Sequence, residues 1–88
     1  MLGPIDGAAV LDLYAGSGAL AIEALSRGAA TALLVERDPR AVAVIRANLE
    51  ALGLAAPEAA VHPGPARAAL GNASERGDTY DLVFLDPP

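Results

Sequence analysis

The sequence has no cysteine, no tryptophan and no lysine, and it has a single histidine. Without cysteine the chain can form neither a disulfide framework nor a thiolate metal site, which is compatible with a reducing compartment. It has no run of about 18 apolar residues that could span a membrane. The first residues also lack the basic-then-apolar pattern of a signal peptide. We therefore expect a soluble, cytoplasmic protein with no membrane association.

Positive charge is scarce as well. The net charge is −5, and all six basic residues are arginines. This balance argues against the segment providing the main phosphate-contacting surface for a nucleic acid, although other parts could hold such a substrate. With 88 residues, of which 53% are hydrophobic, the composition is globular and allows one small domain over residues 1–88.

Strand-like and helix-like segments alternate along the whole chain. The strand-like segments are apolar runs, which predicts a parallel sheet covered by helices on both faces, an α/β fold with strand order 3-2-1-4. Asp38-Pro39 is a strong helix start. The expected strands are 10–14, 32–35 closed by Glu36, 59–62 and 80–85, and the expected helices are 19–27, 39–52 and 66–70. The expected apolar stripes of the first two helices are Leu20, Ala21, Ala24 and Leu25, then Val42, Ile45, Leu49 and Leu52.

Two motifs follow the strands that flank the expected switch point of this sheet. Gly16-Ser17-Gly18 follows the first strand, and Asp86-Pro87-Pro88 follows the fourth. Ligands of open α/β sheets bind at that place, outside the carboxyl ends of the strands. The glycines let the backbone turn sharply beside a ligand. Asp-Pro-Pro offers only acceptors there, because proline has no N–H, and such a corner suits a substrate that carries an amino group.

The glycine motif alone leaves the ligand open between NAD and another adenosine compound. Gly16-x-Gly18-x-x-Ala21 fits the dinucleotide fingerprint, and Glu36 ends the second strand, where an acid can bind ribose hydroxyls. Asp12 favours the second class, because dinucleotide-binding strands are usually apolar at that position. Burial of its carboxylate requires a donor, from the glycine loop or from a cationic ligand. Bracing of the loop and contact with the ligand are equally good interpretations of Asp12.

Together these residues resemble class I S-adenosylmethionine methyltransferases, whose fold is Rossmann-like. The segment 10–20, followed by 23–29, is similar to their first motif, and 35–38 is similar to their second. The segment 81–88 is similar to their amino-methylating signature. The nearest resemblance is to the RsmD-like group, which methylates the exocyclic N2 of a guanine in bacterial small-subunit ribosomal RNA. It covers nearly the whole chain from about Gly7 and implies an N-methyltransferase with RNA as its partner and no metal.

The resemblance also implies roles for individual residues. The S-adenosylmethionine site comprises Asp12, Tyr14, Ala15, Gly16, Ser17, Gly18, Glu36 and Arg37. Within it, the two glycines shape the loop, Asp12 supports the loop or approaches the amino-acid end of the cofactor, and Glu36 binds the ribose diol. The catalytic set is Asp86, Pro87 and Pro88. Asp86 and the Pro87 carbonyl would accept hydrogen bonds from the target amino group.

Two features depart from the family pattern. Gly64 stands where the family often has an acid that reads adenine, and Pro65 removes a nearby N–H, so adenine recognition falls to other groups. The residues that complete the family's sheet do not follow Pro88. We therefore expect a cofactor-binding portion of a larger enzyme, with self-association through the edge of the fourth strand as an alternative. An NAD-linked oxidoreductase fragment and a non-catalytic remnant are the competing functions.

Other residues have simpler interpretations. Arg37, Arg40 and Arg46 could form a weak RNA-facing patch, but a solvated helix face interleaved with acids is the favoured interpretation. Tyr14 lies beside the loop and could touch the cofactor, with packing in the core favoured. His62 fits a partly exposed structural histidine better than a general base.

Overall fold

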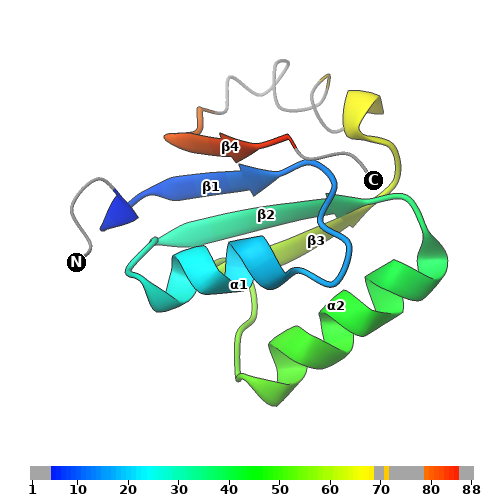
Figure 1. Cartoon of the computed structure of the whole chain (residues 1–88), viewed down its shortest axis with the longest axis horizontal. Coiled ribbons are helices and arrows are strands. Elements are labelled where there is room, and N and C mark those ends of the chain that lie inside the picture. Colours follow the sequence, from blue (N-terminus) through cyan, green and yellow to red (C-terminus); the bar gives the residue numbers. More distant parts are fainter. Residues whose placement is uncertain (1–4, 69–70, 72–78, 86–88) are drawn as a thin grey trace.

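The protein is a four-stranded parallel sheet with two helices, described by a computed structural model for residues 5–68, 71 and 79–85 (Figure 1). The strand order is β3-β2-β1-β4, and every neighbouring pair is parallel. This confirms the predicted order 3-2-1-4. The elements are β1 (Ala9–Asp12), α1 (Ala19–Ser26), β2 (Thr31–Glu36), α2 (Pro39–Ala51), β3 (Ala59–Pro63) and β4 (Leu82–Phe84).

The centre of the sheet is β1 and β2, and it is the best-buried part of the molecule. Val10, Leu34 and Val35 are 0% exposed. Because successive residues of a strand point to opposite faces, the apolar runs supply side chains to both sides of the sheet. Val10 and Leu34 join one buried cluster, whereas Leu11 and Val35 join another. The continuous apolar runs are thus explained by burial on two faces.

Both helices pack on the same face of the sheet (Figure 1). Ala21 and Ala24 of α1 share a buried cluster with Ile45 and Leu49 of α2. On the opposite face, the described residues contribute the cluster of Leu11, Leu13 and Val35, with Tyr80 and Ala66 packed against it. Ala66 opens a helical turn at 66–68; the remainder of the predicted third helix, 69–70, lies outside the described residues.

The helix boundaries follow their capping residues. Asp38 caps α2, its side chain accepts a hydrogen bond from the Arg40 N–H at 3.0 Å, and Pro39 is the first helical residue. Two predicted stripe residues are wrong. Leu20 is 46% exposed because the buried side of α1 centres on Ala21 and Ala24, and Leu52 is 58% exposed because α2 ends at Ala51. Leu54 packs against the core in place of Leu52.

Strand β4 is shorter and more exposed than its sequence predicts. It spans three residues, Leu82–Phe84, where we expected 80–85 to be a buried strand. Val83 is 42% exposed and Leu85 is 63% exposed. The strand pairs only with β1, so among the described residues it lies at an edge of the sheet. Among these residues, none of the helices is long and apolar enough to cross a membrane.

Candidate functional site

The carboxyl ends of β1 and β2 hold the β1–α1 loop in place. The Ala15 N–H donates to the Val35 carbonyl at 3.1 Å, which attaches the loop to the end of β2. The Gly18 N–H then donates to the Ala15 carbonyl at 2.7 Å and closes a tight turn. Asn48 of α2 donates from Nδ2 to the Ser17 carbonyl at 3.0 Å. The loop is therefore fixed by its own turn, by β2 and by α2.

The two loop glycines serve different purposes. Both have positive φ, +59° at Gly16 and +87° at Gly18, a conformation that favours glycine. A Cβ on Gly18 would lie 3.0 Å from Cδ2 of Leu34, so Gly18 also allows a close approach to the core. A Cβ on Gly16 would meet nothing within 4 Å. Gly16 therefore presents bare backbone to open space, as a ligand-binding loop requires.

The start of α1 lacks a side-chain cap. Gly18 is its N-cap residue, and no side chain accepts a hydrogen bond there. The first intrahelical bond runs from the Ile22 N–H to the Gly18 carbonyl at 2.9 Å. The N–H groups of residues 19–21 thus have no acceptor in the preceding turn, and the helix dipole adds partial positive charge. This corner favours an electron-rich group.

Glu36 connects the glycine loop to the start of α2. Its Oε1 accepts the Gly16 N–H at 2.9 Å, and its Oε2 accepts the Asp38 N–H at 3.0 Å. The Glu36 carbonyl also accepts the Gly64 N–H at 2.9 Å, which brings the turn after β3 to the same place. A carboxylate has about four lone-pair sites. Both oxygens can therefore still accept ligand hydroxyls while they hold the loop.

Asp12 lies buried at the last residue of β1. It is 2% exposed and pairs in register with Leu34 on one side and Phe84 on the other. The next residue, Leu13, donates its N–H to the Phe84 carbonyl at 3.1 Å. The buried Asp12 carboxyl thus belongs to the end of the strand that leads into the glycine loop. Whether it braces the loop or approaches a ligand stays a prediction.

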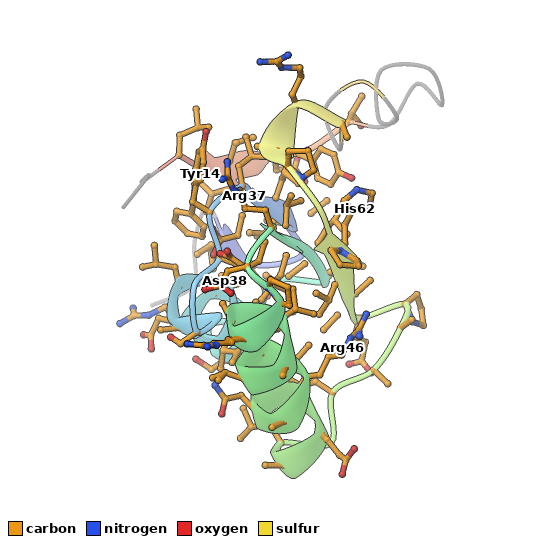
Figure 2. All side chains as sticks on the ribbon, turned by 90° about the vertical axis from the view of Figure 1, so that its right-hand side faces the viewer. Tyr14, Arg37, Asp38, Arg46 and His62 are labelled. Carbon is orange, nitrogen blue, oxygen red and sulfur yellow. The ribbon has the colours of Figure 1, made fainter. Side chains whose placement is uncertain are left out.

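Tyr14 and Arg37 lie side by side at the carboxyl-end face of the sheet (Figure 2). They line an open hollow of about 510 Å³ together with residues 65–68. Tyr14 is 41% exposed, so the favoured packing of Tyr14 in the core is wrong. The reason is that β1 ends at Asp12, which leaves Tyr14 on the loop with its ring at the rim of the hollow. Cofactor contact is then the remaining prediction for both residues.

The predicted catalytic residues Asp86, Pro87 and Pro88 lie outside the described residues. The chain leading to them is described. Because the Phe84 carbonyl accepts the Leu13 N–H, β4 ends beside the start of the glycine loop. The predicted amine-binding residues thus follow, after Leu85, a strand that ends next to the predicted cofactor loop.

The sequence did not identify Asn48 or the Asp38 N–H as parts of the site. Asn48 is a half-buried amide that falls beside Leu49 in the otherwise apolar stripe of α2. A polar residue at such a position was the available signal, since a half-buried amide needs a partner. The Asp38 N–H carries no sequence signal, because only the turn after Glu36 directs it to that carboxylate. Within the described part of the chain, no group of three or more His, Asp or Glu residues could hold a metal ion.

Comparison with known sequences identifies the family. The sequence matches the family described as Conserved hypothetical protein 95 over residues 1–88. YlbH of Bacillus subtilis (strain 168), named as an rRNA methyltransferase, is 45% identical over an alignment of 89 positions, which covers 100% of this chain and 48% of YlbH. Ribosomal RNA small subunit methyltransferase D of Escherichia coli (strain K12) is 40% identical over 82 residues, 89% of this chain and 37% of that protein. The chain thus spans half or less of the length of these relatives.

Solved structures share the fold described above. The structure of yhhF from Escherichia coli, which is named as a methyltransferase, superimposes with a TM-score of 0.83 at 42% identity, over 96% of this chain and 45% of that chain. SMU.776, which is named as a methyltransferase and is in complex with SAH, superimposes with a TM-score of 0.85 at 26% identity, over 96% of this chain and 22% of its own. The sheet order and the glycine loop agree with the sequence match over residues 1–88. The chain belongs to the Conserved hypothetical protein 95 family, the RsmD family of methyltransferases.

Proposed function

We propose that the protein is an S-adenosylmethionine-dependent methyltransferase that modifies an exocyclic amino group of a nucleic-acid base, guanine N2 in small-subunit ribosomal RNA. The observation that carries the proposal is that the Gly16 and Asp38 N–H groups both donate to the Glu36 carboxylate, next to the open backbone at Gly16. The names of the relatives support ribosomal RNA of the small subunit as the substrate, and the resemblance described above supplies guanine N2. The proposal concerns the full-length gene product, because the chain spans half or less of those relatives.

The residues at the carboxyl ends of the strands fit this cofactor. The open backbone at Gly16 and the uncapped start of α1 would receive the amino-acid part, with Asp12 below them. Glu36 would accept the ribose hydroxyls through the lone pairs that the backbone amides leave available. Tyr14 and Arg37 line the hollow in which an adenosine ring would lie. Adenine would be held there by stacking and by backbone groups, since Gly64 and Pro65 offer no acidic side chain.

The target amine is assigned to the corner after β4. When bound, the cofactor supplies a methyl group on a sulfonium. Asp86 and the Pro87 carbonyl would accept hydrogen bonds from the amino group and direct its nitrogen lone pair toward that methyl. Holding both partners in line and stabilising the developing charge would provide most of the rate enhancement. A ribosomal RNA substrate would place this reaction in the cytoplasm.

The competing functions differ in their ligands. An NAD-linked oxidoreductase is favoured by Gly16-x-Gly18-x-x-Ala21, but the relatives reported above are named as methyltransferases. A non-catalytic remnant would bind neither cofactor. Methylation of small-subunit rRNA, with the modified nucleoside identified by mass spectrometry of RNA digests, tests the substrate separately from the cofactor.

Calorimetry with S-adenosylhomocysteine on the full-length gene product tests the cofactor site. Glu36→Gln removes the charge and turns one acceptor into a donor that faces a backbone N–H. We expect at least about tenfold weaker binding from the loss of charge-assisted hydrogen bonds. The matched control is Glu23→Gln on α1, because Glu23 is exposed and, among the described residues, its carboxylate pairs with Arg27 alone. Failure of the unaltered protein to bind at millimolar ligand would refute the proposal, and equal binding by both variants would remove Glu36 from the site.

A further inference from the structure

Charge is unevenly distributed between the two ends of the sheet. Asp6, Glu58 and Asp81 precede β1, β3 and β4, at the amino ends of the strands. Arg37 follows β2, and Arg67 lies in the helical turn after β3. The carboxyl ends also carry Asp12, Glu36 and Asp38, so acids and arginines lie close together at the end that holds the glycine loop.

Three arginines at or near this end, which are named below, have no acidic partner in the described part of the chain. Among the described residues, the one ion pair joins Arg27 to Glu23 on α1. Arg37, Arg46 and Arg67 are exposed and form no ion pair. The nearby carboxylates of Glu36 and Asp38 keep their negative charges, but in the described part of the chain their hydrogen bonds go to backbone N–H groups and not to these arginines. Their exposure agrees with the favoured interpretation of a solvated face, and the guanidinium groups on that face are available to a ligand.

Two hollows connect the three arginines into one row. Arg67 and Arg37 line the hollow of about 510 Å³ beside Tyr14. Arg37 and Arg46 line a second hollow of about 390 Å³ between the start of α2 and the end of β3. Figure 2 shows Arg37 next to Tyr14 and Arg46 farther along α2. We call Arg67, Arg37 and Arg46 the arginine row.

The other residues of the second hollow give it an apolar floor. Pro39, Val42, Ala43 and Pro63 line it together with Gly64. None of these side chains carries a charge or a hydrogen-bond donor, so the arginines at its edges provide the polar recognition. Guanidinium groups bind phosphate oxygens in a bidentate manner, and they do so more specifically than an ammonium group does. A chain of phosphodiesters with sugars between them matches this alternation of charged edges and apolar floor.

We infer that the arginine row binds the sugar-phosphate backbone of the RNA substrate next to its target nucleotide. The inference rests on the proposed function, because it assumes that the target base reaches the corner after β4. That corner follows β4 and Arg37 follows β2; β1 lies between these strands, so two strand spacings of about 4.8 Å each separate their carboxyl ends. Phosphate contacts fix the position of a nucleic acid without reading its sequence. The row would thus orient the RNA while other parts select the base.

The test measures RNA affinity of the full-length gene product against salt concentration. Arg46→Gln/Arg67→Gln is compared with Arg46→Lys/Arg67→Lys, with a mixed-sequence fluorescent single-stranded RNA as the probe and anisotropy as the readout. Arg37 is left unchanged because it belongs to the predicted cofactor site. Arg67 lines the hollow proposed for adenosine, so S-adenosylhomocysteine affinity is also measured for both double variants. We expect the Gln pair to weaken binding on the order of tenfold and to lower the salt slope by about one unit per arginine. The Lys pair should keep most of the slope, because it retains both charges.

Arg27→Gln is the matched control, since Arg27 is an exposed arginine that already has an acidic partner. It should leave the salt slope unchanged. S-adenosylhomocysteine binding, measured in parallel, separates the two proposals: if the unaltered protein does not bind it, the proposed function fails. If it does bind and the Gln and Lys pairs give the same slope as the unaltered protein, the arginine row is refuted. Loss of binding to ribosomal particles alone, with naked RNA unaffected, would also refute it and indicate a protein contact.

Discussion

The two strand-to-helix corners of the molecule are built differently. The corner between β2 and α2 is complete in itself: Asp38 caps the helix with its own side chain, and Pro39 starts it. The corner between β1 and α1 has Gly18 in a left-handed conformation and no side-chain cap. Two helices that cover the same face thus begin in opposite ways.

The difference separates stability from function. A capped helix start satisfies its amides locally, and substitution of such a cap typically costs about 1 kcal/mol. An uncapped start leaves amides available and gives up that stabilisation. The β1–α1 loop is compensated by contacts from outside, namely the Val35 carbonyl, the Glu36 carboxylate and the Asn48 amide. We interpret the corner between β2 and α2 as structural and the corner between β1 and α1 as ligand-binding.

Among the substitutions that test this difference between the corners, Gly18→Ala should have the largest effect on stability. The new Cβ would lie 3.0 Å from Cδ2 of Leu34, which is fully buried and has little room to move. The left-handed backbone adds its own cost for a residue with a side chain. We expect the free energy of unfolding to fall by about 2–3 kcal/mol, measured by urea denaturation.

Gly16→Ala is the matched control for that experiment. It has the same sign of φ but no atom within 4 Å of the added methyl group. It should cost only about 1 kcal/mol of stability and should instead weaken S-adenosylhomocysteine binding, because the methyl group would occupy the ligand side of the loop. If both substitutions destabilise the protein equally, the division of the two glycines into packing and ligand roles is wrong.

Asp38→Ala should have an intermediate effect at the other corner. It removes the acceptor of the Arg40 N–H but leaves Pro39 and the backbone bond to Glu36 in place. We expect a loss of about 1 kcal/mol in urea denaturation, while Asp38→Asn, which keeps a capping oxygen, should lose less. If Asp38→Ala reduced S-adenosylhomocysteine affinity more than it reduced stability, the corner would not be purely structural.

The sequence was sufficient to predict the sheet order and the places of the glycine loop and of Glu36. These depend on local patterns, such as apolar runs ending in Gly16-Ser17-Gly18 or in Asp38-Pro39, together with the handedness of the connections. Prediction from the sequence failed where the burial of a side chain depends on which other elements pack against its strand or helix. Leu20 and Leu52 were expected inside and are exposed, and Val83 is exposed at the edge of the described sheet.

In the site, too, some features could be predicted from the sequence and others could not. The position of Glu36 at the end of a strand could be predicted, but its two bonds to backbone amides could not, because they join residues 20 positions apart or depend on the exact turn. Tyr14 was placed in the core because it extends an apolar run. The strand ends two residues earlier, at Asp12, and that small shift moves the ring to the rim of the hollow.

Asn48→Ala should have the smallest effect on stability and the most informative one on binding. Its Nδ2 links α2 to the Ser17 carbonyl, so it joins the self-sufficient helix to the ligand-binding loop. Because Ser17 is exposed, water can replace the lost donor, and we expect only about 0.5 kcal/mol in urea denaturation. S-adenosylhomocysteine affinity should nevertheless fall severalfold by calorimetry, since the loop would no longer be held in its binding conformation. Asn48→Asp, of similar size but without the donor, should behave in the same way; unchanged affinity in both variants would show that β2 and Glu36 alone hold the loop.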